Sequence, residues 1–159
     1  MAKFIAMEEI ILNDHNKQEY PPMHSAEHIL NQTMTRMFGC ERSKSSHIER
    51  KKSKCDYILK VAPGPVEIAE IESRVNEVIR QNLPITIAFV NHSDVPEGID
   101  LSKLPEDSSE TLRLVSIGNY DTCACIGQHV SNTSEIGTFR IISTDYADGK
   151  LRIRFKLEN

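Results

Sequence analysis

The stretch Met23-His24-Ser25-Ala26-Glu27-His28-Ile29-Leu30 decides what fold is expected of this 159-residue chain. Side chains that can face a core continue its pattern at the i, i+3, i+4, i+7 spacing of an amphipathic helix: Ile29, Leu30, Thr33, Met34, Met37 and Phe38. Pro21 and Pro22 bias the preceding residues toward extended conformation, and Gly39 follows the last apolar pair. The spacing therefore predicts a helix that starts at or just after Met23 and ends at Phe38.

His24 and His28 are four residues apart on this predicted helix. Residues at this spacing leave the same helix face one turn apart, so both imidazoles can converge on one point. Two histidines alone would be an ordinary boundary pair on a helix. A metal site therefore requires further ligands from elsewhere in the chain.

Such ligands are present in the stretch Asp121-Thr-Cys-Ala-Cys-Ile-Gly-Gln-His-Val130. Cys125 and His129, with Gly127 between them to allow a tight turn, would complete a tetrahedral group of three histidines and one cysteine, or leave one position to water. Zinc accepts both imidazole and thiolate ligands. Cys123 would share a face with Cys125 in an extended segment, so it is a competing ligand.

These two motifs resemble the editing domain of alanyl-tRNA synthetases and their free-standing relatives, the AlaX-type editing proteins. The resemblance also includes the flanking stretches Val115-Ser-Ile-Gly118 and Val130-Ser-Asn-Thr-Ser-Glu-Ile-Gly137, and it runs from about Pro22 to Ile142. Threonyl-tRNA synthetase editing domains are more distantly similar. The usual second motif of the family is Cys-Gly-Gly-Thr-His, whereas this chain has Ile126 and Gln128, and Ser25 stands where threonine is common.

The resemblance implies a hydrolase that removes a wrong amino acid from tRNA, most plausibly serine and possibly glycine from tRNA(Ala), acting in trans. It implies Zn²⁺ held by His24, His28, Cys125 and His129. The substrate pocket would then include Ser25, His47, Ile126, Gly127 and Gln128. Two alternatives stay open: a threonyl-type editor of Ser-tRNA(Thr), because the second motif departs from the alanyl pattern, and a non-catalytic tRNA-binding module stapled by zinc.

A basic hairpin is predicted after Gly39, with strands near Lys44 to Glu49 and Lys54 to Val61 around a polar turn at 51–53. Although the chain has a formal net charge of -4, six cations gather here: Arg42, Lys44, Arg50, Lys51, Lys52 and Lys54. Local positive charge suits phosphate contact, although lysines also simply solvate exposed turns. The resemblance favours the first interpretation, with a tRNA as the partner. His47 lies on the first of these strands.

The remaining pattern predicts one α+β domain of two layers, with two principal helices packed on a mainly antiparallel sheet. A second helix begins at Pro65 and ends before Pro84. Strands are expected at 4–12, 85–90 and 111–117, and a closing hairpin at 137–144 and 150–157. A long polar loop spans 91–110. The expected division is an N-terminal lead-in at 1–21 and an editing core at 22–159.

Composition indicates a cytoplasmic location. No apolar run approaches the roughly 18 residues that a membrane span needs, and Met1 to Leu12 lacks the basic and apolar regions of a signal peptide. In such a chain the four cysteines are expected as free thiols or metal ligands rather than disulfides. Cys40 and Cys55 fit buried or strand thiols.

Overall fold

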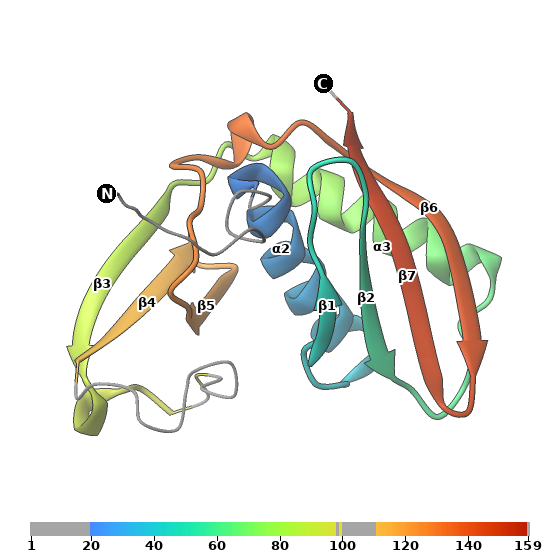
Figure 1. Cartoon of the computed structure of the whole chain (residues 1–159), viewed down its shortest axis with the longest axis horizontal. Helices are drawn as coiled ribbons and strands as arrows, with labels where there is room; N and C mark the ends of the chain where they lie inside the picture. Colours follow the sequence, from blue (N-terminus) through green and yellow to red (C-terminus); the bar gives the residue numbers. More distant parts are fainter. Residues whose placement is uncertain (1–19, 98, 100–110, 159) are drawn as a thin grey trace, which may run out of the picture.

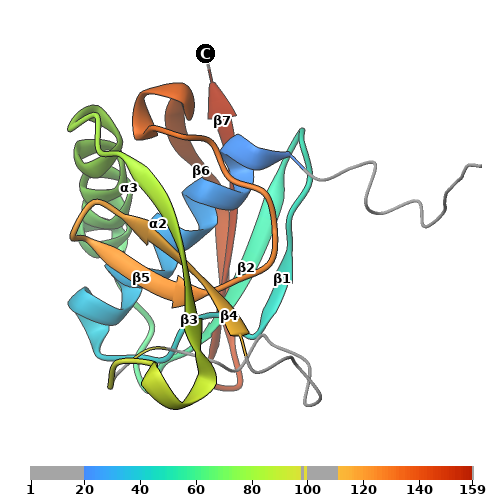
Figure 2. The same cartoon turned by 90° about the vertical axis from the view of Figure 1, so that its left-hand side faces the viewer.

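A central helix separates two antiparallel sheets in the computed structural model, which describes residues 20–97, 99 and 111–158. Figure 1 shows this helix, α2 (Pro21–Phe38), between the three-stranded sheet on the left and the four-stranded sheet on the right. Figure 2 shows the same arrangement from the side of the smaller sheet. The α+β class, the two principal helices and the antiparallel pairing are confirmed.

The four-stranded sheet has the order β1-β2-β7-β6, and every neighbouring pair is antiparallel. Its strands are β1 (Ser45–His47), β2 (Ser53–Ile58), β6 (Thr138–Ala147) and β7 (Lys150–Glu158). The predicted hairpins at 44–61 and 137–157 thus form, and they join through β2 and β7. Because these two strands are almost a hundred residues apart in sequence, the local pattern could not show their pairing.

The three-stranded sheet has the order β3-β4-β5. It consists of β3 (Ile85–Asn91), β4 (Thr111–Ile117) and β5 (Asp121–Ala124), and short 3₁₀ turns follow at η1 (His92–Asp94) and η2 (Thr133–Glu135). The strands are therefore divided between two sheets, where the sequence suggested one. The segment after β5 passes over the start of α2 to reach β6, so the chain leaves the smaller sheet on one side of the helix and joins the larger sheet on the other (Figure 1).

Helix α2 begins at Pro21, two residues before the predicted start, because proline is well suited to the first helical position. It ends at Gly39, which adopts a left-handed φ of 70° and donates its N–H to the Thr35 carbonyl oxygen at 2.8 Å. Side chains are buried nearly all around its N-terminal half, including the polar Glu27, His28 and Asn31. A helix between two sheets has no solvent face there, which explains burial that an amphipathic pattern does not predict.

The hairpin of β1 and β2 is anchored to α2 by buried polar groups. The Tyr57 hydroxyl donates to Asn31 Oδ1 at 2.6 Å, and the backbone N–H of Ser43 donates to the same oxygen at 3.3 Å. Tyr57 is almost fully buried together with the core side chains of β6 and β7. The hairpin and the helix that carries His24 and His28 are therefore held in a fixed relation.

Helix α3 (Pro65–Arg80) packs against β6, the edge strand of the larger sheet. The Asn76 side chain donates to the Phe139 carbonyl oxygen at 2.9 Å and accepts from the Phe139 N–H at 2.7 Å. Glu72 accepts from the Ile141 N–H at 2.8 Å. Side chains of α3 thus satisfy backbone groups that a further strand would otherwise pair.

Two predictions lie partly or wholly outside the described residues. The strand expected at 4–12 is outside them, and the 91–110 loop is described only through residue 97 and at residue 99. Among the helices that are described, none is long and apolar enough to cross a lipid bilayer.

Candidate metal centre

Four side chains from two separate elements form one cluster at the start of α2. His24 and His28 come from the helix, whereas Cys125 and His129 come from the segment that follows β5. One possible ligand atom of each residue lies within 4.8 Å of the others. Cys125 Sγ is 3.5 Å from His24 Nε2 and 3.7 Å from His129 Nε2. This donor set can hold a metal ion and is compatible with zinc.

The three imidazole rings are packed against one another around the sulfur. The rings of His24 and His129 are stacked with centroids 4.2 Å apart, and His28 meets them edge-on at 4.9 and 4.4 Å. Such close packing of three bases would be unfavourable if all were protonated, because like charges repel. A metal cation bound by three neutral rings would avoid this repulsion.

The protonation of Cys125 and His129 suits metal binding. Burial opposes ionisation of the Cys125 thiol, but hydrogen bonds from His129, His24 and His28 outweigh it and lower the pKa of this thiol to about 3. Burial lowers the pKa of His129 to about 4, against the opposing hydrogen bond to Cys125. Near neutral pH the pair therefore consists of a thiolate and a neutral imidazole, the forms that bind metal.

Neighbouring groups orient His24 and His129, the two stacked histidines of the cluster. His24 Nδ1 lies 3.1 Å from the Gln128 carbonyl oxygen. Since a carbonyl can only accept, Nδ1 carries the proton, and Nε2 is the nitrogen with which His24 could bind a metal. Ser25 Oγ lies 3.0 Å from His129 Nδ1 and also accepts the Val130 N–H at 3.3 Å. Partners of this kind fix the tautomer and ring orientation of metal-binding histidines.

The cysteine segment is held by Arg113, which the sequence analysis did not single out. Its guanidinium donates to the carbonyl oxygens of Cys125 at 3.0 Å and Gly127 at 2.6 Å. The Gly127 N–H donates to Cys125 Sγ at 3.4 Å, which stabilises the thiolate. In the sequence Arg113 stands out only as the single cation of the predicted strand 111–117. That does not indicate which groups its guanidinium binds.

A second buried group lies on the other side of His28. Cys123 Sγ is 3.3 Å and Asp121 Oδ2 is 3.7 Å from His28 Nδ1. Arg42 donates to both Asp121 oxygens at 2.7 and 3.2 Å, and Gln32 donates to Oδ1 at 3.2 Å. The Arg42 guanidinium already supplies a positive charge beside the Asp121 carboxylate. Among the contacts described, Cys123 touches one member of the four-residue cluster, His28, and it lies outside that cluster.

The charged side chains of this second group shift one another's pKa. Burial disfavours ionisation of Asp121, but His28 and Arg42 outweigh burial and hold the pKa of its carboxyl below the ordinary value. Burial alone would lower the pKa of His28, yet hydrogen bonds to Asp121, Cys123 and Cys125 raise it well above the ordinary value. Asp121 is thus an ionised partner for the His28 ring.

The other predicted pocket residues are dispersed. Ile126 is 72% exposed beside the cluster. His47 is exposed and paired with Glu49, in a surface hollow of about 310 Å³ that also includes Lys54 and Arg154. The structure does not bring His47 into the His–Cys cluster, since its side chain is exposed and lies in this hollow instead.

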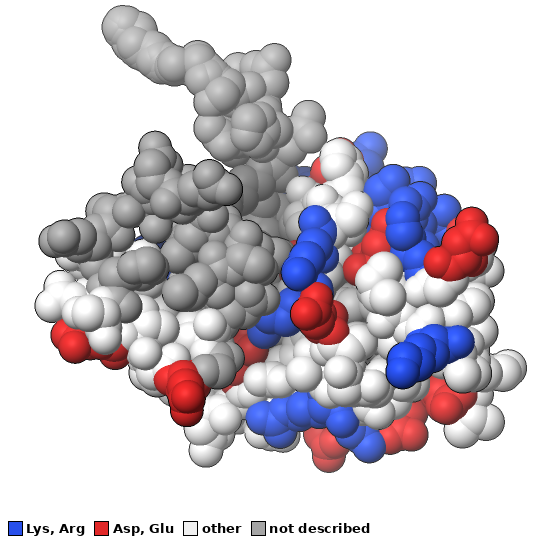
Figure 3. Space-filling view, turned by 90° about the horizontal axis from the view of Figure 1, so that it is seen from below, with Lys and Arg blue, Asp and Glu red and all other residues white. Residues whose placement is uncertain are grey.

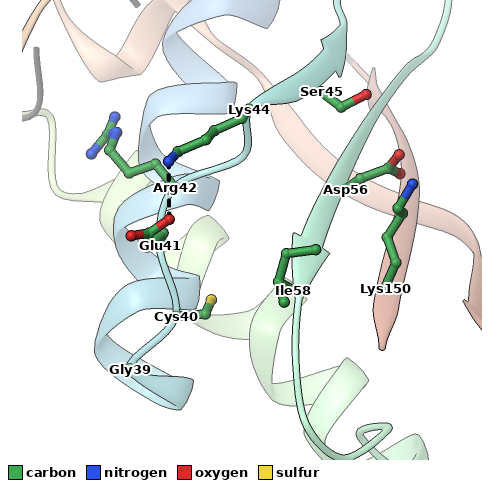
Figure 4. Close-up of a pocket in the computed structure, with 9 residues that line it drawn as sticks. All are labelled: Gly39, Cys40, Glu41, Arg42, Lys44, Ser45, Asp56, Ile58 and Lys150. Carbon is green, nitrogen blue, oxygen red and sulfur yellow. Dashed lines mark ion pairs between the residues drawn. The ribbon is translucent and has the colours of Figure 1, made fainter. Parts of the chain in front are cut away.

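The predicted phosphate-binding cations also divide. The Arg42 side chain is only 12% exposed and is engaged with Asp121. Lys44 pairs with Glu41 beside a surface hollow of about 360 Å³, where Figure 4 shows Lys150 and Asp56 on the opposite wall. Arg50 stacks on the Tyr20 ring, 4.4 Å from its centroid.

Comparison with known proteins agrees with this geometry. Residues 112–154 match the family model described as "Threonyl and Alanyl tRNA synthetase second additional domain". Over 148 residues the chain is 30% identical to the alanine-tRNA ligase of Methanococcus vannielii, which covers 91% of this chain and 17% of the relative. It is 32% identical over 121 residues to the alanine-tRNA ligase of Neisseria meningitidis serogroup B, which covers 76% of this chain and 14% of that relative.

The chain thus spans less than a fifth of the length of these relatives. The matched region includes nearly all of β4, then β5, the segment with Cys125 and His129, β6, and β7 as far as Arg154. The resemblance drawn from the two motifs is confirmed: this chain is similar to the editing domains of alanyl- and threonyl-tRNA synthetases.

Proposed function

We propose that this chain hydrolyses the ester that joins a wrong amino acid to tRNA, with Ser-tRNA(Ala) as the preferred substrate. The observation that supports this most is the His–Cys cluster, assembled from α2 and the segment after β5 in an editing-domain fold. The sequences most similar to this chain include alanine-tRNA ligases, which favours tRNA(Ala) over tRNA(Thr).

We propose Zn²⁺ as the ion held by His24, His28, Cys125 and His129. When bound there it would supply Lewis-acid polarisation or an anchor for the substrate amino group. The donor set fits: one sulfur and three imidazole nitrogens, with the thiol and His129 already in ligating form.

The residues of the chain contribute positioning. Arg113 and Ser25 hold the backbone on both sides of His129, which favours a single position of this segment for the substrate to meet. The Gly127 N–H is directed at Cys125 Sγ and is not available to stabilise an oxyanion. Ile126, exposed beside the cluster, offers an apolar surface to the 3′ end of the tRNA.

Gln128 is proposed to recognise the serine hydroxyl. Replacing it with alanine would remove the polar partner by which a site discriminates a hydroxyl from a methyl group. We expect the ratio of Ser-tRNA(Ala) to Ala-tRNA(Ala) hydrolysis to fall about tenfold or more, since a lost hydrogen bond in a site is worth roughly 1.4 kcal/mol or more. Rates of both substrates give this ratio, and an unchanged ratio would remove Gln128 from specificity.

A deacylation time course tests the proposal directly. Purified protein, with its zinc content quantified, is incubated with Ser-tRNA(Ala), Ser-tRNA(Thr) and Ala-tRNA(Ala). Loss of serine from tRNA(Ala) alone, with about one zinc per chain, is the expected result. Faster hydrolysis of Ser-tRNA(Thr) would identify a threonyl-type editor.

One observation favours a second candidate, a non-catalytic tRNA-binding module. Two of the four donors lie on α2 and two lie on the segment that follows β5 of the smaller sheet. A metal bound by all four would therefore also fasten α2 to this segment. A folded, zinc-loaded protein that binds tRNA but hydrolyses none of the three substrates would establish this module instead.

A further inference from the structure

Every second residue along β7 is basic and faces away from the helices. Leu151, Ile153 and Phe155 are buried in the core. The alternate positions carry cations on the opposite face of the sheet: Lys150, Arg152, Arg154 and Lys156. At about 6.6 Å between successive cations, this row extends about 20 Å along the strand.

The neighbouring strands add to this row. Residues directly opposite in antiparallel strands share a face, and the register places Lys54 opposite Arg154 and Arg140 opposite Lys156. We call this side of the four-stranded sheet the outer face. Its cations are Lys54, Arg140, Lys150, Arg152, Arg154 and Lys156, and its acids are Asp56, Asp145 and Glu158.

The acids hold some of these cations in place without cancelling the charge. Arg152 pairs with Asp56 at 2.9 Å, and Arg154 pairs with Asp145 at 2.6 Å. Glu72 of α3 also lies 3.8 Å from Arg140, so six cations face four acids, which still leaves an excess of positive charge on a protein whose formal net charge is -4. The rest of the molecule must therefore be acidic.

The basic side chains are concentrated on one half of the molecule. Seen from below, Lys and Arg side chains lie at the centre and right, interspersed with Asp and Glu, whereas the described surface at the far left shows acidic side chains (Figure 3). The described part of the smaller-sheet half carries Asp94, Glu97 and Glu135, and its one arginine, Arg113, is engaged with backbone carbonyls.

The outer face is continuous with the metal centre. The turn between β1 and β2 carries Arg50, Lys51 and Lys52, and both views place this turn beside the start of α2 (Figures 1 and 2). Arg50 stacks on Tyr20, whose carbonyl accepts the His24 N–H at 3.0 Å. A nucleic-acid strand that passes over this turn would therefore come to the start of α2, where His24 belongs to the His–Cys cluster.

We propose that the outer face binds the phosphate backbone of the tRNA acceptor stem, whose 3′ end then passes over the 50–52 turn to the His–Cys cluster. This inference rests on the proposed function. Double-stranded RNA is recognised mainly through its backbone and shape, which suits a sheet face with a row of cations. Sequence-independent attraction comes from the phosphates that such cations neutralise.

Binding of uncharged tRNA(Ala) transcript to two matched variants tests the surface. Lys54→Gln/Lys150→Gln removes two charges from the outer face, and Arg74→Gln/Arg80→Gln removes two from exposed positions on α3. We expect the first to weaken binding about tenfold near 0.1 M salt and to reduce the slope of log K against log salt by about 1 to 2. The second should bind as the wild type does.

Equal affinities for the two variants would overturn the proposal. Failure of the surface and failure of the proposed function are distinguishable, because hydrolysis is measured separately on saturating Ser-tRNA(Ala). An outer-face variant that retains the wild-type rate at saturation and shows a raised KM supports the surface. Wild-type protein that binds tRNA through this face and hydrolyses no substrate would leave the surface standing and reject the deacylase.

Discussion

Replacing Cys125 with alanine is expected to abolish metal binding and with it deacylation. Cys125 contributes the one thiolate of the cluster, and three histidines converge on it. Loss of an outer partner of a ligand typically costs 10 to 100-fold in metal affinity, so loss of the ligand itself should cost more than about 100-fold. Zinc affinity by competition with a chelator, and the rate on Ser-tRNA(Ala), measure the two effects.

Cys123→Ala is the matched control. It removes a buried thiol two residues before Cys125, in β5, that contacts His28 from outside the cluster. We expect zinc affinity to fall far less than in the Cys125 variant. If Cys123→Ala lost the metal and Cys125→Ala kept it, the ligand group would be His28, Asp121 and Cys123, and the assignment made here would be wrong.

Replacing Arg42 with methionine is expected to destabilise the protein by about 3 kcal/mol or more, because it leaves the buried Asp121 carboxylate without its main partner. Both oxygens of Asp121 receive a hydrogen bond from this guanidinium, and the carboxylate is almost fully buried. For a chain of this size that loss lowers the melting temperature by roughly 6 to 12 °C. Thermal and urea unfolding followed by circular dichroism measure it.

The double variant Arg42→Met/Asp121→Asn separates an unpaired charge from lost packing. Neutralising Asp121 removes the uncompensated charge, so the double variant should recover a substantial part of the stability. If Arg42→Met unfolds at the wild-type temperature, the ion pair contributes nothing measurable.

Local patterns were sufficient to predict most of the described elements, though not β5, and to predict each half of the cluster separately. The histidine pair needed only helical spacing, and Cys125 with His129 needed only a short turn, so each half of the site was visible in a few residues. The limits of α2 were off by two residues at its start, where proline opens the helix. The family resemblance then joined the two halves.

Long-range pairing was beyond the sequence pattern. The division into two sheets depends on β2 pairing with β7, and Asp121 meeting Arg42 depends on how the small sheet docks on α2. Arg42 looked like one more cation of an exposed hairpin, since nothing nearby in sequence indicates a buried partner. Electrostatic pairing between distant segments becomes readable only once the topology is known.

The basic row of β7 was present in the sequence as a simple alternation of cations and apolar residues. That alternation predicts a strand with one buried face, which the structure confirms. The basic face could be recognised only from the strand pairing, because β2 and β6 place Lys54 and Arg140 on the same side of the sheet as the cations of β7. A surface is a property of several strands together.

The contacts between α3 and β6 bear on how this protein behaves at high concentration. An edge strand with unpaired backbone groups can recruit strands from other molecules and initiate aggregation. Here the amide of Asn76 occupies both groups of Phe139, and Glu72 occupies the next outward N–H. These side chains of α3 imitate a neighbouring strand, and the edge is thereby closed to intermolecular β-sheet growth along that stretch.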